Sequence, residues 1–143
     1  MADSRRFKAP AGKHPVVVLF DNDNGAKAIL ETAKKVKYGK TDPYIHVAGN
    51  LYLVPTPLLS GQQQSMIEDF FDPSTLAATV DGKTFNPSDD KDSVTEFGKN
   101  VFAHKVVKAN ADTISFVGFT PILDNIVAAI RAHAQKPTSA ATP

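Results

Sequence analysis

The chain has no cysteine and no tryptophan among its 143 residues. Without cysteine, disulfides and thiolate metal sites are excluded. Sixteen lysine and arginine residues stand against fifteen acidic residues, so the net charge of +1 shows no marked excess of either sign. Such a balance neither requires nor excludes nucleic acid as a partner, because a local basic surface can coexist with a small net charge.

Long apolar runs are also missing. No stretch approaches the roughly 20 residues of a membrane-spanning helix, and the polar N-terminus lacks the apolar core of a secretion signal. We therefore expect a cytoplasmic protein with no membrane partner. The hydrophobic content of 42% is ordinary for a globular protein, and the length suits one domain.

The chain does contain short apolar strands alternating with amphipathic helices. Residues 16–20, Val-Val-Val-Leu-Phe, are typical of a buried strand in a parallel sheet, and residues 26–37 follow with helical spacing. Residues 44–47 and 51–54 predict two more strands. A last helix is predicted after Thr120-Pro121, with an apolar stripe of Ile122, Leu123, Ile126, Val127 and Ile130.

These elements indicate an α/β protein with a small, mostly parallel sheet flanked by helices. Two further helix starts are predicted by the capping-box spacings Ser65-x-x-Glu68 and Ser93-x-x-Glu96. We expect a single domain over residues 15–135. Residues 1–14 are predicted to be a flexible arm or the cut edge of something larger, and residues 136–143 a disordered tail.

Asp21 and Asp23 directly follow the first strand. Ligands bind at the carboxyl ends of strands in parallel α/β sheets, and residues i and i+2 of a strand point to the same side. Two carboxylates placed there repel each other unless a cation or hydrogen-bond donors satisfy them. Mg²⁺, or Mn²⁺ in its place, is the natural partner. The alternative is a polar turn in which Asn24 caps the next helix.

Two other known motifs share the Asp-x-Asp pattern. An EF-hand loop is excluded, because Gly25 and Glu31 each fall one position too early and a strand precedes the loop. A phosphatase of the haloacid-dehalogenase type stays open, with Asp21 as nucleophile and Asp23 as general acid/base. The motif of that family resembles Asp-x-Asp-x-Thr/Val, whereas Gly25 stands at the last position here.

Further candidates lie later in the chain. Glu68 and Asp69 sit between apolar residues, where they would add metal ligands or an orienting carboxylate. The capping box with Ser65 is the structural alternative. Lys99 follows Gly98 near the start of a predicted helix, where a lysine can pair with a phosphate, although most lysines at such places are simply solvated.

Several segments together resemble the C-terminal region of certain retron-type reverse transcriptases, in which a Toprim-like (topoisomerase–primase) domain follows the polymerase. They are "HPVVVLFDNDNGAK", "NLYLVPTP", "SMIEDFFD", "FGKNVFAHKVV" and "ISFVGFTPILDNIVAAI". The resemblance covers residues 13–134. It implies a partial Toprim/Rossmann-like fold and a covalently linked reverse transcriptase domain in the full protein. It also implies Mg²⁺-dependent cleavage or transfer of phosphodiesters in DNA or RNA.

The resemblance also assigns site residues. Asp21 and Asp23 match the family's metal-binding Asp-x-Asp. Glu68, Asp69 and Lys99 are similar to the further acidic and lysine positions of Toprim nucleases related to the overcoming-lysogenisation-defect group. In this interpretation Asp21, Asp23, Glu68 and Asp69 hold the metal, and Lys99 stabilises charge on the phosphate.

One departure from the family pattern concerns its first-strand glutamate, which should precede the Asp-x-Asp. The twenty residues before Asp21 contain no glutamate. The resemblance therefore implies the later part of such a domain, and two outcomes stay open for the isolated chain: it is active, or it binds metal weakly and is inactive. The alternative function is a non-catalytic docking or oligomerisation domain in which residues 21–24 form a structural turn. The sequence predicts no particular oligomeric state.

Overall fold

The computed structural model describes residues 13–33, 36, 39 and 41–135, and the chain divides into two compact units. Unit 1 combines residues 1–67 with residues 121–143, whereas unit 2 is formed by residues 68–120. The expected tail lies outside the described residues, as does the expected arm apart from residues 13 and 14. Within the described part of the chain, every helix falls short of the length and apolarity needed to cross a bilayer.

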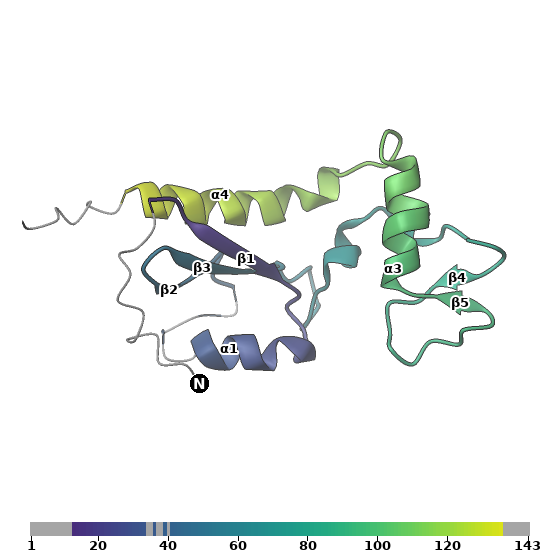
Figure 1. The fold of residues 1–143 in the computed structure, drawn as a ribbon, viewed down its shortest axis with the longest axis horizontal. Helices are drawn as coiled ribbons and strands as arrows, with labels where there is room; N and C mark the ends of the chain where they lie inside the picture. Colours follow the sequence, from purple (N-terminus) through teal and green to yellow (C-terminus); the bar gives the residue numbers. More distant parts are fainter. Residues whose placement is uncertain (1–12, 34–35, 37–38, 40, 136–143) are drawn as a thin grey trace, which may run out of the picture. The chain divides into compact units, whose positions relative to one another are not determined.

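The sheet of unit 1 has three strands in the order β1 (Val16–Phe20), β3 (Leu51–Pro55) and β2 (Ile45–Ala48) (Figure 1). All three lie where the sequence predicts strands. β1 runs parallel to β3, but β2 is antiparallel to β3, so this sheet is mixed. Only two residues join β2 to β3, and Gly49 in this turn has a positive φ of 54°, which glycine adopts at little cost.

Helices cover both faces of this sheet (Figure 1). On one face lie the 3-10 helix η2 (Asn24–Ala26) and α1 (Lys27–Ala33), and on the other lies α4 (Thr120–Ala134). The α1 face buries Phe20, Ala26, Ile45 and Leu53, with Ile29 and Leu30 packed against them. The α4 face buries Tyr52, Val54 and Ala129, with Val17, Leu19, Tyr44 and Ile126 packed against them.

The predicted apolar stripe of α4 is only partly correct. Ile122 is buried, and Ile126 packs against the sheet together with Ala129. The other three members of the stripe are exposed, Leu123 by 57%, Val127 by 39% and Ile130 by 44%. The helix therefore has a second apolar flank that its own unit leaves in solvent.

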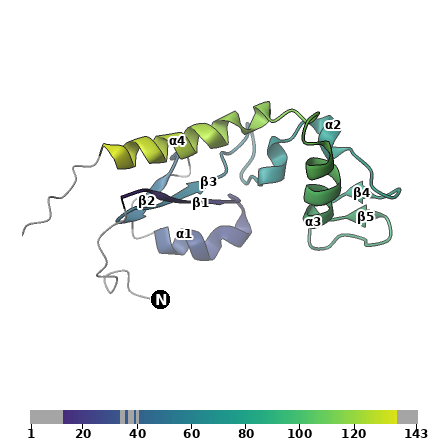
Figure 2. The same cartoon turned by 45° about the horizontal axis from the view of Figure 1, so that its top comes forward.

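Unit 2 is built from short elements. They are η3 (Ile67–Phe70), α2 (Pro73–Leu76), β4 (Thr84–Phe85), β5 (Glu96–Phe97), α3 (Lys99–Val101), η4 (Phe102–Val107), η5 (Lys108–Asn110) and η6 (Val117–Phe119). Figure 2 shows α3 beside the parallel pair of β4 and β5. α3, the π-helical η4 and the 3-10 helix η5 follow one another without a gap. With the strands of unit 1 they give a mixed helix and strand protein, as the α/β class requires.

Phenylalanine dominates the core of unit 2. Phe97, Phe102 and Val106 form its buried centre. The Phe85 ring stacks on that of Phe102 with centroids 4.2 Å apart, and the Phe71 ring meets Phe102 edge-on at 5.4 Å. Such aromatic pairs contribute about 0.5–1.5 kcal/mol each beyond the area they bury, so they compensate for the scarcity of regular structure.

The helix predicted to start at the Ser93-x-x-Glu96 capping box begins later, at Lys99, because Glu96 lies in β5. Asp92 organises the preceding turn instead. Its carboxylate accepts hydrogen bonds from the Val94 N–H at 2.9 Å and the Thr95 hydroxyl at 2.8 Å. Its own N–H donates to Glu96 Oε2 at 2.8 Å. The prediction of a helix start at Ser93 is therefore wrong, because Asp92 and Glu96 close a loop here.

The Asp92 turn predicts a pH-dependent stability. The hydrogen bonds from Val94 and Thr95 lower the pKa of Asp92 below its usual 3.8. A lowered pKa means that the charged form stabilises the folded state, fully above pH 3.8 and less as the pH falls through the lowered value. We expect Asp92→Asn to lower the Tm slightly at neutral pH, because the group is exposed. The difference should vanish in acid.

Thermal unfolding of both proteins between neutral pH and about pH 2 checks this expectation. Asp89→Asn is the matched control, because it removes a charge from the same loop but not the hydrogen bonds of Asp92. A wild-type advantage that persists in acid would contradict the assignment.

Candidate functional site

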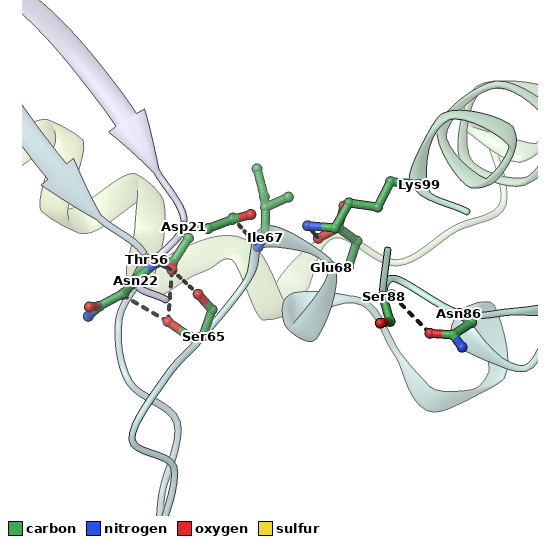
Figure 3. Close-up of polar contacts among 9 residues, drawn as sticks. All are labelled: Asp21, Asn22, Thr56, Ser65, Ile67, Glu68, Asn86, Ser88 and Lys99. Atoms are coloured by element: carbon green, nitrogen blue, oxygen red, sulfur yellow. Dashed lines mark hydrogen bonds and ion pairs between the residues drawn. The ribbon is translucent and has the colours of Figure 1, made fainter. Parts of the chain in front are cut away.

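Asp21 lies at the carboxyl end of β1, directly beyond the last pair of the parallel β1–β3 ladder. Its Oδ1 accepts a hydrogen bond of 2.8 Å from the backbone N–H of Ile67 (Figure 3). The side chain is half-buried. The predicted position at the end of a parallel strand pair is therefore confirmed, and one backbone donor orients the carboxylate there.

A buried polar network fixes the chain between the two aspartates (Figure 3). Asn22 forms a bridge with Ser65 through both backbone hydrogen bonds, at 2.8 and 3.0 Å. The Thr56 hydroxyl accepts from the Asn22 N–H at 2.9 Å and lies 2.7 Å from the Ser65 hydroxyl. The Asn22 amide and the Ser65 hydroxyl both donate to the Thr56 carbonyl. Satisfied buried networks of this kind hold one backbone geometry.

Asp23 caps the turn that follows the network. Its Oδ1 accepts from the N–H groups of Gly25 at 2.8 Å and Ala26 at 3.2 Å, which makes it the N-cap of η2. The alternative prediction, that Asn24 is the cap, is wrong, because the helical turn already begins at Asn24. Both hydrogen bonds go to the same oxygen, so Oδ2 of this carboxylate takes part in neither.

Alternation along the extended chain places Asp21 and Asp23 on one side. Asn22 is buried with its side chain bonded to Thr56, and Asp23 has extended backbone angles of −128° and −173°. Because side chains of an extended chain alternate, the carboxylates on either side of Asn22 project away from the buried network. Two oriented, half-buried carboxylates thus flank one rigid residue at the sheet edge.

Glu68 and Lys99 are brought together in unit 2 (Figure 3). Glu68 is 8% exposed, and its Oε2 lies 3.1 Å from the Lys99 Nζ. Among the described residues this oxygen accepts no well-aligned hydrogen bond, so the lysine meets it as an ion pair. Burial of a carboxylate is costly without a partner, so the lysine stabilises Glu68, although the Lys99 side chain is 38% exposed and water screens the attraction.

The predicted capping box of Ser65 and Glu68 does not form. The Ser65 side chain belongs to the network with Thr56, and Glu68 pairs with Lys99 instead. Asp69 follows Glu68 in η3 and is half-buried. The structural alternative to a function for Glu68 is therefore an ion pair that anchors the start of unit 2, and not a helix cap.

The five predicted residues thus belong to both units, Asp21 and Asp23 to unit 1 and the other three to unit 2. Within the described residues, no three or more acidic or histidine side chains gather as a group that could hold a metal ion. The roles of all five stay predictions.

Sequence reasoning missed Asn22, Thr56 and Ser65. Thr56 stands between two prolines at the end of a buried strand, and proline has no N–H to donate. A hydroxyl at that place is the natural partner for nearby backbone groups. Asn22 stands between two aspartates, and an uncharged residue at such a place has no spacing or periodicity that would indicate a buried network.

No model of a known protein family matches the chain, and no solved structure matches it. The chemistry of the residues themselves therefore carries the functional argument.

Proposed function

We propose that the protein is a Mg²⁺-dependent module that cleaves or transfers phosphodiesters in nucleic acid, with a Toprim-like active site in which Asp21 and Asp23 hold the metal. The observation that carries the proposal is the rigid placement of the two carboxylates. The network of Asn22, Thr56 and Ser65 fixes the backbone between them at the end of the parallel strands. Preorganisation of this kind is what catalytic constellations require.

The donor set fits a hard divalent cation. Mg²⁺ is commonly held by one or two carboxylates together with waters and substrate phosphates, so a pair of aspartates is sufficient. Asp21 and Asp23 are both carboxylates, and Oδ1 of each accepts hydrogen bonds from backbone N–H groups. When bound, the ion would neutralise charge that develops on the phosphate and activate a nucleophile. The aspartates would position it, while their N–H donors keep them in one orientation.

The distribution of charge supports a nucleic-acid partner for unit 1. Its two segments carry eleven lysine and arginine residues against six acidic ones, whereas unit 2 carries five against nine. The small net charge of the chain therefore conceals a basic unit and an acidic unit. The proposed metal ligands belong to the basic unit, as expected where a polyanion must approach two carboxylates.

Glu68 and Lys99 would take part as an ion pair. A lysine beside a carboxylate can transfer its hydrogen bonds to a phosphate, as the prediction for Lys99 requires. A cation at 3.1 Å also neutralises Glu68, which makes this carboxylate a poorer metal ligand while the pair is intact. We propose Lys99 as the phosphate-binding member, with Glu68 holding it in place.

The alternative function, a docking domain with a structural turn, is favoured by one observation. Asp23 caps η2, so it already has a structural task. Metal binding distinguishes the two functions, because a ligand that binds only the folded state raises the midpoint of unfolding.

We expect millimolar Mg²⁺ or Mn²⁺ to raise the Tm of the full chain. At ten times the Kd the stabilisation is about 1.4 kcal/mol, which corresponds to about 3–5 °C for a chain of this size. The double variant Asp21→Asn/Asp23→Asn should lose the shift. Asn caps helices as well as Asp does, so this variant removes the charges and keeps the turn. An equal shift in both proteins, or none in either, would favour the docking domain.

A further inference from the structure

β1 is an edge strand of the sheet in unit 1. The Val16 N–H donates to Asn50 at 2.8 Å and the Phe20 carbonyl accepts from Thr56 at 3.0 Å, so these residues direct their backbone groups to the β3 side. By alternation, the N–H and C=O groups of Val17 and Leu19 point to the other side. No described strand lies there. Such an edge is a template for another strand.

Apolar side chains accompany this open edge. Val16 and Val18, on the α1 face of β1, are 50% and 39% exposed. They are short, β-branched residues without charge, and the described part of the strand carries none of the inward-pointing lysines that protect edges in monomers. The edge strand β1 therefore has exposed apolar side chains as well as backbone groups that no described strand pairs.

The exposed flank of α4 overhangs the same edge. The opposite flank of this helix lines a pocket of about 310 Å³ through Asn125, together with Thr41 and Asp42, which precede β2. That flank therefore faces the β2 side of the sheet. Leu123, Val127 and Ile130 lie on the other flank of α4, which follows from 3.6 residues per turn, so they face the β1 side.

We propose that β1 and this flank of α4 form the interface of a symmetric homodimer, in which β1 pairs antiparallel with β1 of a second copy. A twofold axis perpendicular to the sheet passes beside Val18. Val17 then exchanges both backbone hydrogen bonds with Leu19 of the second copy, and Val18 faces Val18. The inference does not depend on the proposed metal site.

The helices fit the same axis. α4 packs against residues of both β1 and β3, so it lies about one strand spacing from the axis. Two such distances give a separation of about 9–10 Å between α4 and its copy, within the about 8–10 Å of packed helices. The three exposed residues of each helix would therefore interdigitate across the axis, on the same face of a continuous six-stranded sheet.

Charge complementarity favours a second copy over another partner. Antiparallel pairing about Val18 brings the start of one β1 beside the end of the other, so Lys13, just before β1, and Asp21 and Asp23 of the second copy, just after it, come to the same end of the interface. One surface thus carries both the basic and the acidic member, as an isologous interface requires. Pro15, which has no N–H, ends the ladder opposite Asp21 and so disfavours a register shift that would move it further into the ladder.

Cysteine cross-linking tests the register directly, because the chain has no cysteine of its own. In the proposed pairing, Val18 and its copy form a non-hydrogen-bonded pair with Cα atoms about 4.5 Å apart, a distance that a disulfide spans. We expect the full-length Val18→Cys variant to form a disulfide-linked dimer under mild oxidation. Val16→Cys is the matched control, since its two copies would be about 14 Å apart.

The control is demanding because Val16 is more exposed than Val18. Random collisions would link Val16→Cys at least as fast, so equal linkage of both variants, or none of Val18→Cys, would overturn the proposal. Sedimentation equilibrium of the cysteine-free chain gives a second measurement. Val127→Glu should weaken its dimer at least tenfold, whereas Asn125→Ala on the opposite flank should not. A chain that is monomeric at all concentrations would refute the interface.

Discussion

Replacement of Asp21 by asparagine should reduce Mg²⁺-dependent cleavage of nucleic acid by the full chain at least 100-fold. The change keeps the shape of the side chain. It also keeps an oxygen that can accept the hydrogen bond from the Ile67 N–H, which the aspartate accepts at 2.8 Å. It removes the negative charge, on which the affinity of a hard cation depends. Loss of one group that stabilises a transition state commonly costs about 10²–10³ in rate. The measurement is cleavage of plasmid and single-stranded DNA with Mg²⁺ or Mn²⁺.

Three comparisons make this result specific. Asp23→Asn should reduce the rate similarly, although Asn preserves the N-cap of η2. Lys99→Met should also slow the reaction but leave the metal dependence unchanged. Glu31→Gln removes an exposed charge from α1 of the same unit and should retain the activity. Equal cleavage by wild type and Asp21→Asn would refute the proposed function.

Replacement of Gly118 by alanine should strongly destabilise unit 2. A Cβ at this position would lie 2.2 Å from the backbone carbonyl oxygen of Phe70, where no atom can fit. Neither partner is a flexible side chain, so the backbone of η6 or of η3 must move. The movement would also disturb the Phe70 and Phe119 rings, whose centroids are 6.1 Å apart. We expect a cost of about 3 kcal/mol and a fall in Tm of about 10 °C or more.

Gly98→Ser is the matched control for this change. A Cβ there would meet Lys91 Cε at 2.8 Å, which is a nominal clash as well. The obstacle is the end of a flexible lysine, which can turn aside, and serine is a good residue at this N-cap. Calorimetry of both variants should show a large loss for Gly118→Ala and little change for Gly98→Ser. Similar losses in both would contradict the backbone-contact argument.

Much of unit 1 could be predicted from local pattern. The β-branched run at 16–20 and the two runs near 45 and 51 alternate or cluster as strands do, and the glycine between the latter two closes a hairpin. The direction of β2 is a property of that short connection, because a two-residue turn permits only antiparallel pairing. The apolar run of β1 predicts parallel strands, but it contains no information on the antiparallel direction of β2.

Unit 2 could be predicted less well because tertiary contacts decide its local structure. Glu96 has capping-box spacing, yet it lies in a strand that pairs with β4, where its partner is Thr84, twelve positions earlier in the chain. Phe97 and Phe102 are both buried in one cluster, yet they belong to different elements, β5 and η4. In unit 2, the packing of the aromatic core decides the conformation of each segment, and the local propensity of the segment does not.

For the site, the sequence identified the carboxylates but not what holds them. Asp21 and Asp23 could be found because paired charge after an apolar strand is conspicuous. Thr56 and Ser65, which fix the turn, are 34 and 43 residues away from Asn22 and have no charge. Contacts over such separations leave no periodic pattern, so only the folded chain shows them.

The order of the segments in unit 1 has a consequence for folding during synthesis. The unit is discontinuous, because residues 68–120 are inserted between its sheet and α4. When the ribosome has made β1, β2 and β3, one face of the sheet still lacks the helix that buries Tyr52 and Val54. The inserted unit is one continuous stretch of chain and can fold before α4 emerges, in keeping with the rapid folding of local contacts. The sheet of β1, β2 and β3 therefore keeps one apolar face uncovered until α4, the last helix of its unit, leaves the ribosome.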